Sequence, residues 1–472
     1  MASVIKLATP GVYVQEISTF PPSVAEVETA IPAFIGYTEK AAKAGVDLKK
    51  IPTKVTDFSQ YTLWFGGPQP EAADSIVVTV ADDGNGNFTA TTTTNPAKQS
   101  KHNLAYAVRH YFDNGGATCY VVSVGPYAAA PGTVVAKDLT DGLAVVNDVD
   151  EVTLLVIPEA PVSDNYADVV QKMIAQAASL ADRFAIIDPQ KVTPKDAANP
   201  AGDIKGDTDI VKNAANNGAV NVRYAAAYYP NLVTSYARAY KIDDLVIDGA
   251  SPALPGKKLG DISTSAAYAK IVSAIGKAYV ELPPSPAIAG LYARVDSTKG
   301  VWKAPANEGL LSVVSPSIPI SDREQGALNI DVDNGKSINV IRTFPGYGPL
   351  VWGARTLNGN DNEWRFISVR RFFIMVEESI KKSIQWAVFE PNTIDTWVKV
   401  QAMIENYLVL KWRQGALAGQ KQEQAFFVKV GLGTTMTAQD ILEGRMNVEI
   451  GMAVARPAEF FILKFSQLMQ QS

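Results

Sequence analysis

The pattern of apolar positions between residues 33 and 300 predicts buried strands that alternate with helices. Short apolar runs bounded by turn residues are typical of strands that are covered on both faces, and such runs here are AFIGYT, CYVVSV, VTLLVIPE, FAIIDP and YAAAYYP. Between them, segments such as ADVVQKMIAQAASLADR repeat apolar residues with the period of a helix. This alternation predicts an α/β domain over residues 33–300 with a largely parallel sheet.

One segment interrupts this alternation. Residues 75–98 contain two β-prone stretches on either side of Asn85-Gly86, which is a typical two-residue hairpin turn. The second stretch is rich in threonine, which suits an exposed strand. We therefore expect a hairpin insertion at about residues 65–100 that decorates the surface of the domain.

After residue 300 the pattern predicts a second, α+β domain over residues 301–455. Two long amphipathic segments, VRRFFIMVEESIKKSIQWAVFE and NTIDTWVKVQAMIENYLVLKWRQGAL, are expected to be helices. A later stretch alternates apolar and other residues, which predicts a strand with one face in the core; its apolar residues are Met446, Val448, Ile450, Met452 and Val454.

The segment LNIDVDNGKSINV at the start of this domain reads as a hairpin. A two-residue loop would consist of Asn334 and Gly335, whereas a three-residue loop would also include Asp333. The longer loop places apolar residues of both strands on one face, so it is the favoured alternative, with Gly335 in a left-handed conformation.

Both ends of the chain carry β-prone segments that proline-containing connectors separate from the domains. Residues 1–32 form an N-terminal arm and linker with prolines at positions 21, 22 and 32, and residues 456–472 form a C-terminal arm. A lone strand cannot pair its backbone groups or bury its side chains, so each arm requires a sheet. From the residues alone, that sheet is either the chain's own or that of a neighbouring copy. The β-prone arm residues are Val12, Tyr13, Val14, Phe460, Phe461, Ile462, Leu463 and Phe465.

Composition and charge exclude several classes of protein. Hydrophobic residues make up 47% and charged residues 19%, as in folded globular proteins, and the net charge of −5 does not suit a nucleic-acid binder. The single cysteine, Cys119, excludes an internal disulfide and is expected to be a small buried residue. Neither a secretory signal nor an apolar run of about 18–20 residues is present, so we expect folding in the cytoplasm and no direct membrane insertion.

The sequence offers little catalytic chemistry. His102 and His110 lie eight residues apart, too far for a metal shared between successive helical turns. The segment GLGTT (431–435) has the order strand, glycines, helix, but lacks the third glycine of a dinucleotide-binding loop. We therefore expect no catalytic residues, no cofactor and no metal. The alternative is an α/β enzyme or ligand-binding protein that uses GLGTT or a cleft at the carboxyl ends of the strands.

The C-terminal part of the chain is relatively basic. Residues 340–472 contain 15 Lys and Arg and 12 Asp and Glu, in a chain whose net charge is −5. Lys411, Arg413, Lys421 and Lys429 follow one another near the end of the last long helix. Such a group is either a solvated face or a partner-binding face, and the charge pattern does not distinguish the two.

Several segments resemble the tail sheath proteins of contractile phage tails and related contractile injection systems. The resemblance covers both ends and much of the chain in the same order, in TPGVYVQEIS, AIPAFIGYTEKA, VRHYFDNGGATCYVVSV, GVWKAPAN, INVIRTFPGYGPLVWGARTL, EWRFISVRRFFIMVEESIKKSIQWAVFEPN and EFFILKFSQ. It implies a structural subunit, not an enzyme, that polymerises into a helical contractile sheath of stacked hexameric rings around an inner tube. Contraction of such a sheath drives the tube through a target envelope.

The resemblance also implies roles for particular residues. The two arms would exchange strands with adjacent subunits, the α/β domain would face outward, and the C-terminal domain would face the tube. The receiving edge would comprise Val448, Ile450 and Met452, and the tube-facing residues would be Lys411, Arg413 and Lys421. Type VI secretion sheaths fit less well, because they divide this architecture between two chains.

The implied partners are other copies of the chain, the inner tube protein, and the baseplate and tail terminator proteins, with no nucleic acid. The subunit would assemble in the bacterial cytoplasm as part of a phage tail or injection particle, which lysis releases or the cell retains.

Overall fold

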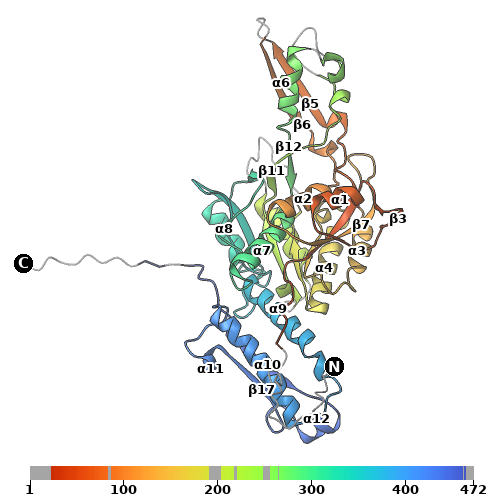
Figure 1. The fold of residues 1–472 in the computed structure, drawn as a ribbon. Coiled ribbons are helices and arrows are strands. Elements are labelled where there is room, and N and C mark those ends of the chain that lie inside the picture. The colour runs from red at the N-terminus through yellow and green to blue at the C-terminus, as the bar shows by residue number, and fades with distance from the viewer. Residues whose placement is uncertain are drawn as a thin grey trace, which may run out of the picture. The chain divides into compact units, whose positions relative to one another are not determined.

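The computed structural model describes residues 23–82, 87–190, 203–216, 221–247, 256–263, 265–460 and 462–463. The chain forms two compact units (Figure 1). The large unit comprises residues 27–378 and 454–472, and the small unit comprises residues 1–26 and 379–453. Helix α9 (Ile367–Ser383) continues from one unit into the other.

A mixed sheet of nine strands organises the large unit, in the order β13-β16-β15-β10-β9-β8-β1-β7-β4. The strands from β15 to β7 pair in parallel, whereas β13, β16 and β4 add antiparallel edges. The predicted largely parallel sheet is therefore confirmed. The strands are β1 (Pro32–Thr38), β4 (Thr53–Val55), β7 (Cys119–Pro126), β8 (Leu154–Val156), β9 (Phe184–Ile187), β10 (Ala225–Tyr229), β13 (Glu308–Gly309), β15 (Ile338–Phe344) and β16 (Gly348–Val351).

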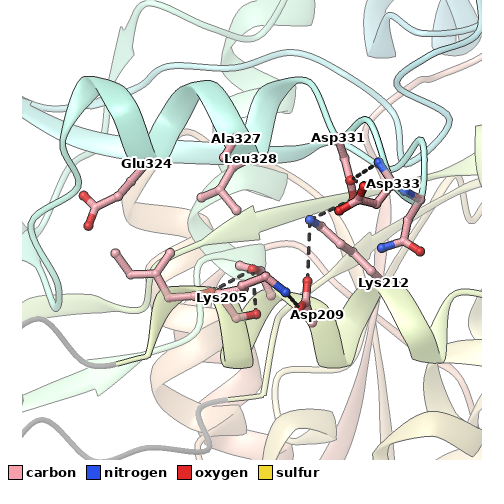
Figure 2. Close-up of a pocket in the computed structure, with 11 residues that line it drawn as sticks. Lys205, Asp209, Lys212, Glu324, Ala327, Leu328, Asp331 and Asp333 are labelled. Atoms are coloured by element: carbon pink, nitrogen blue, oxygen red, sulfur yellow. Dashed lines mark hydrogen bonds and ion pairs between the residues drawn. The ribbon is translucent and has the colours of Figure 1, made fainter.

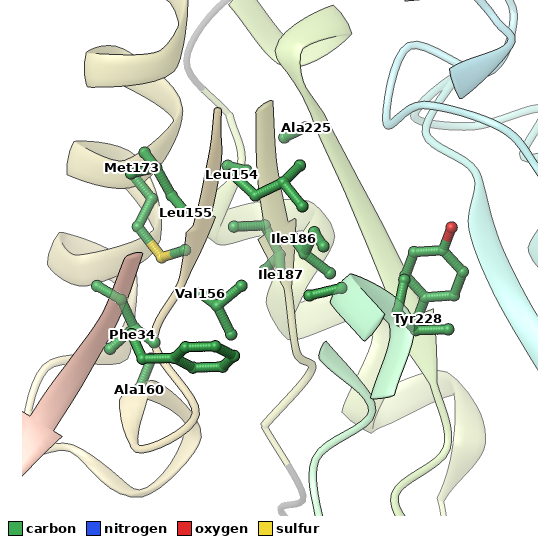
Figure 3. Packing of buried hydrophobic residues seen from close by; sticks show 14 of the residues in the cluster. Phe34, Leu154, Leu155, Val156, Ala160, Met173, Ile186, Ile187, Ala225 and Tyr228 are labelled. Carbon is green, nitrogen blue, oxygen red and sulfur yellow. The ribbon is translucent and has the colours of Figure 1, made fainter. Parts of the chain in front are cut away.

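Helices cover both faces of this sheet, because every residue of β1 is buried although its side chains alternate between the faces. Phe34, Val156 and Ile186 lie at one level of three adjacent strands, since Phe34 pairs with Val156 and Val156 with Ile186 (Figure 3). Continuous apolar strands therefore mark a core with two sides. The helices of the large unit are α1 (Phe58–Phe65), α2 (Leu104–Asp113), α3 (Ala136–Ala144), α4 (Tyr166–Leu180), α5 (Ile204–Ala214), α6 (Ala266–Ile275), α7 (Ser285–Lys299) and α8 (Asp322–Asn329), with the first part of α9.

The close packing of α2 on α7 depends on a glycine. A Cβ atom at Gly290 would lie 2.5 Å from the carbonyl oxygen of Tyr111, which is backbone and cannot move aside cheaply. A residue without a side chain lets the two helices approach at this level. A second joint is Asp188, which follows β9 and accepts hydrogen bonds from the N–H (2.8 Å) and hydroxyl of Ser285 at the start of α7.

The expected hairpin insertion is present. Strands β5 (Ile76–Asp82) and β6 (Phe88–Thr94) pair antiparallel, and α6 packs against them around a small apolar core that is separate from the main one. The turn at Asn85-Gly86 lies outside the described residues. A three-stranded sheet of β11 (Leu232–Ala237), β12 (Tyr279–Leu282) and β14 (Val313–Pro316) completes the unit.

The structure divides the chain at a different place from the expected boundary at residue 300. Strands β13, β15 and β16 belong to the nine-stranded sheet, so residues 301–378 are part of the large unit. The reason is long-range: β15 pairs in parallel with β10, more than 100 residues earlier, and extends the sheet.

The predicted hairpin in LNIDVDNGKSINV is wrong. Leu328 lies in α8, a helix that begins with a capping box in which the Ser321 and Glu324 side chains bond each other's backbone N–H groups. The Asp331 carboxylate then accepts bonds from two N–H groups in the following turn. The expected left-handed Gly335 is confirmed, with a φ of 68°.

The small unit packs helix α10 (Ile394–Arg413) on a two-stranded antiparallel sheet of β17 (Phe426–Val430) and β18 (Val448–Met452). Short helices α11 (Gln422–Ala425) and α12 (Ala438–Leu442) flank β17. The predicted apolar stripe of α10 is buried, and its residues are Trp397, Val400, Ile404 and Leu408.

Candidate functional site

The outer edge of β18 carries backbone groups that point away from its partner strand. The N–H of Ala453 bonds the carbonyl of Ala425 (2.8 Å), and the register continues with Phe426 opposite Met452 and Val428 opposite Ile450. Bonded and non-bonded pairs alternate in an antiparallel ladder. The N–H and C=O groups of Val448, Ile450 and Met452 therefore face outward, and no backbone group in the described part of the chain bonds them.

The opposite edge of the sheet is partly occupied. On β17, the N–H of Phe426 bonds the carbonyl of Gln422, and the Val428 carbonyl accepts from the Gln401 side chain on α10 (3.3 Å). The side chains of Val448, Ile450 and Met452 are only half-buried, although they share the core-facing side of the sheet with buried Phe426 and Val428. The apolar face of the sheet thus extends to an edge at which the backbone groups are unpaired within the described residues and the side chains are only half-buried.

The C-terminal arm exposes apolar side chains. Phe460, Ile462 and Leu463 are 68%, 82% and 76% exposed, and none of the three is assigned to a strand. Burial of each side chain would contribute about 1.5–3 kcal/mol. The other predicted arm residues, namely Phe461, Phe465, Val12, Tyr13 and Val14, lie outside the described residues.

A buried ion pair holds the connector to the N-terminal arm. The Thr29 hydroxyl donates to Asp296 (2.7 Å) on α7, and Arg371 on α9 donates to Asp296 (3.0 Å) and to the Thr29 carbonyl (3.2 Å). The N–H of Ile31 donates to the Thr153 hydroxyl (2.9 Å). The connector is therefore fixed to the large unit immediately before β1 begins.

The structure separates the three basic residues that were expected to face a tube. Arg413 and Lys421 are exposed, but Lys411 is only 5% exposed and forms an ion pair with Glu26 inside the small unit. Lys411 is therefore not a surface residue here. Its place in the helix explains the difference, since it shares the buried side of α10 with Tyr407 and Leu408.

The two histidines have packing roles. His102 stacks on Tyr127, with ring centroids 5.3 Å apart, and its Nδ1 lies 3.7 Å from a carboxylate oxygen of Glu159. His110 Nε2 lies 3.2 Å from the Leu311 carbonyl, and burial lowers the pKa of His110 to about 4. Within the ranges that the structure describes, no cluster of His, Cys, Asp and Glu side chains could hold a metal ion.

Two other groups that catalysis could use are also structural. Burial raises the pKa of the Asp188 carboxyl to about 7, but this carboxyl is bonded to Ser285 and joins β9 to α7. Cys119 begins β7 and is fully buried, as predicted, and burial raises the pKa of its thiol.

A pocket of about 380 Å³ lies between α5 and α8 in the large unit (Figure 2). Lys212 pairs with Asp331 at 2.9 Å, and Lys205 pairs with Asp209 at 2.6 Å. The first pair joins α5 to the loop after α8, and the second lies within α5, so each lysine in the wall has a carboxylate partner. This arrangement is that of a structural crevice, and it does not supply an activated acid or base.

The GLGTT segment is a turn and not a dinucleotide loop. The N–H groups of Thr434, Thr435 and Met436 bond the carbonyl of Gly431. The turn leads from β17 to the five-residue helix α12, and β17 pairs antiparallel with β18. A dinucleotide site requires a parallel βαβ unit, so this part of the enzyme alternative is wrong. Among the described residues, no helix combines the length and apolar character needed to cross a membrane.

Sequence reasoning missed the residues that fix the arms to the large unit. Glu459, immediately before the apolar arm residues, bonds Arg355, which lies 104 residues earlier in the chain. Asp296 and Arg371 lie even farther from Thr29, at 267 and 342 residues. The only signal in the sequence is that Glu459 is a charged residue next to an apolar run, and this does not reveal which residue it pairs with.

Comparison with known proteins gives one consistent result. The phage tail sheath protein central domain matches residues 132–357, and the phage tail sheath C-terminal domain matches residues 359–467. The chain is 30% identical to the sheath of PVC, an extracellular contractile injection system, in the contracted state, with 98% of each chain covered and a TM-score of 0.64.

Two structures of the anti-feeding prophage (AFP) are similarly related. The chain is 31% identical to its helical sheath in the contracted state (TM-score 0.65) and 31% identical to a chain of its baseplate (TM-score 0.63), with 98% of this chain and 99% of the other covered in both cases. A search among curated proteins finds no match. The two matched domains and these relatives show that this chain, a structural protein of the contractile injection type, belongs to the phage tail sheath family.

Proposed function

We propose that this chain polymerises into a helical contractile sheath of stacked hexameric rings around an inner tube, and that each arm adds a strand to a neighbouring subunit. The C-terminal arm would pair with the outer edge of β18. One observation carries this assignment: the same chain has an uncovered strand edge at Val448, Ile450 and Met452 and an exposed apolar segment beginning at Phe460. Pairing of the segment with the edge would give both of them backbone hydrogen-bond partners and would bury their apolar side chains.

The proposal accounts for the exposed apolar side chains. An open strand edge and exposed apolar side chains such as those of Phe460, Ile462 and Leu463 are aggregation hazards in a monomer. If the arm of one subunit covers the edge of the next, the contact is head-to-tail and continues as a helical polymer. The N-terminal arm, through Val12, Tyr13 and Val14, would add a further strand in the same way.

Contraction follows from a difference in packing between two states of the polymer. The extended sheath stores free energy because the contracted subunits bury more surface. The free energy released per subunit is small, but it adds up over a long polymer. Contraction therefore needs no nucleotide hydrolysis. The arms keep neighbouring subunits connected while the subunits rotate and slide, and the tube is driven through a target envelope.

The remaining partners follow from this arrangement. The small unit would face the inner tube protein through Arg413 and Lys421, and the large unit would face outward. The ends of the sheath would bind baseplate and tail terminator proteins, a view supported by the AFP baseplate chain among the relatives. Assembly would take place in the bacterial cytoplasm, and the particle would be released by lysis or retained in the cell.

Replacement of Ile450 by proline tests the receiving edge. The Ile450 N–H points away from β17, so proline removes an outward donor without breaking a β17–β18 hydrogen bond, and prolines are tolerated on strand edges in this orientation. We expect Ile450→Pro to fold as a monomer but to form no sheaths, as judged by sedimentation and electron microscopy.

Ile450→Ala is the matched control, because it shortens the same side chain and keeps the N–H. We expect this variant to assemble. Assembly of the proline variant to the same extent as the alanine variant would show that the β18 edge receives no strand.

A further inference from the structure

Residues 454–459 return to the large unit after β18 ends in the small unit. The Arg456 guanidinium donates to the carbonyl of Asn362 (2.8 Å). The Glu459 carboxylate then receives hydrogen bonds from the Arg355 guanidinium, with Nε at 3.0 and 3.2 Å from its two oxygens and Nη2 also in contact. This short segment is therefore attached to the large unit at two points.

Arg355 is itself firmly placed. Its side chain is only 4% exposed, and its Nη1 donates to the carbonyls of Asn329 and Gly359, each at 3.3 Å. Its backbone N–H donates to Asn339 (2.7 Å) on β15, a strand of the main sheet. A bidentate bond between arginine and a carboxylate fixes both position and direction, so Glu459 is held in one orientation on the sheet of the large unit.

The attachment ends where the apolar arm begins. Glu459 is half-buried against Arg355, whereas the next residue, Phe460, is 68% exposed. We propose that the Arg355–Glu459 pair is the anchor of the C-terminal arm, which orders residues 454–459 before assembly and sets the point and direction from which residues 460–472 leave the subunit. This inference rests on the proposed strand exchange.

The anchor acts by preorganisation. The segment from Phe460 to Ser472 has 13 residues, which span at most about 3.3–3.6 Å each. Without the anchor, the three residues after the Arg456 contact, from Pro457 to Glu459, must also be ordered when the arm enters a neighbour. A longer and undirected tether lowers the effective concentration of the arm at its receiving edge.

Glu459→Gln tests the anchor in the full-length chain. The substitution keeps the size of the side chain and removes the charge that holds Arg355. We expect the critical concentration for sheath assembly, measured by sedimentation over a protein dilution series, to rise at least tenfold, which corresponds to about 1.4 kcal/mol. We also expect faster hydrogen exchange in residues 454–459 of the unassembled protein.

Glu363→Gln is the control, since it removes one negative charge from an exposed side chain of the same unit. It should assemble as the unchanged protein does. If Glu459→Gln assembles at the unchanged critical concentration, the anchor proposal is overturned. Arg456→Ala, which removes the other attachment, should raise the critical concentration in the same direction, and an unchanged value would also count against the anchor.

Failure of the anchor proposal can be distinguished from failure of the proposed strand exchange. A chain that ends at Glu459 and still forms sheaths would contradict strand exchange itself. A chain that ends at Glu459 and forms none, together with normal assembly of Glu459→Gln, would contradict the anchor alone.

Discussion

A chain shortened to residues 1–459 should fold as a monomer and form no sheath at all. The deletion removes Phe460, Ile462 and Leu463, which are exposed and contribute almost no burial to the monomer. It retains Glu459, so that buried Arg355 keeps its partner. We therefore expect the free energy of unfolding to change by less than about 1 kcal/mol, as for surface changes in general. Assembly should be abolished, because every joint in the polymer loses the same strand.

Size-exclusion chromatography and negative-stain electron microscopy of the shortened chain measure both parts of this expectation. A matched control ends at Met469 and lacks only the polar residues 470–472. It should assemble. Sheaths formed by the chain that ends at Glu459 would show that the arm is not a joint, whereas an unfolded product would show that the arm packs within its own subunit.

Asp296→Ala should cause the largest loss of stability among single substitutions in the arm connectors. Asp296 and Arg371 are 7% and 4% exposed, and the Arg371 guanidinium also lies 4.4 Å from the Tyr292 ring centroid. Removal of the carboxylate leaves a buried guanidinium without its counter-charge and also removes the acceptor of the Thr29 hydroxyl. Loss of one partner from a buried pair costs about 3–5 kcal/mol.

Urea unfolding of the unassembled protein, followed by circular dichroism, measures this change as a shift of the midpoint. The control is Asp322→Ala, because Asp322 is 93% exposed and pairs with Arg342 at the surface. Such pairs are worth at most about 1 kcal/mol. Equal midpoints for the two variants would contradict the role assigned to the Asp296–Arg371 pair.

Local patterns were sufficient for most of the elements. The apolar runs of β1, β7, β8, β9 and β10 are bounded by turn residues and became the parallel core of the sheet. The long helix α10 and the alternating strand β18 were also evident, because burial on one face imposes a period on the sequence.

Features that depend on contacts between distant residues were not predictable in the same way. The segment before β15 contains Asn334-Gly335 and reads locally as a hairpin, but the capping box at Ser321 favours a helix over Leu328. The boundary between the two units was misplaced because β15 pairs with β10, more than 100 residues earlier, and so carries β16 and β13 into the sheet of the large unit. Pairing partners in parallel sheets are far apart in sequence, and a single sequence does not record them.

In the candidate site, too, some residues were identifiable from local pattern and others depended on distant contacts. The arm residue Phe460 and the edge residue Ile450 were identifiable from local pattern, since one lies in an apolar run and the other in a strict alternation. Lys411 was misjudged because charge alone does not reveal burial, and its partner Glu26 lies 385 residues away. Glu459 was overlooked because its partner, Arg355, lies 104 residues earlier in the chain.

Cross-linking between different copies of the chain tests strand exchange most directly. The single native cysteine, Cys119, is fully buried and lies far from the arm in the sequence. Subunits that carry only Ile462→Cys are mixed with subunits that carry only Glu449→Cys on β18, assembled, and treated with a short bismaleimide. Strand exchange predicts covalent dimers from the mixture and none from either variant alone. A chain that carries both added cysteines serves as the comparison. If only this chain becomes cross-linked, and the product is a monomer with an internal cross-link, strand exchange between copies is contradicted.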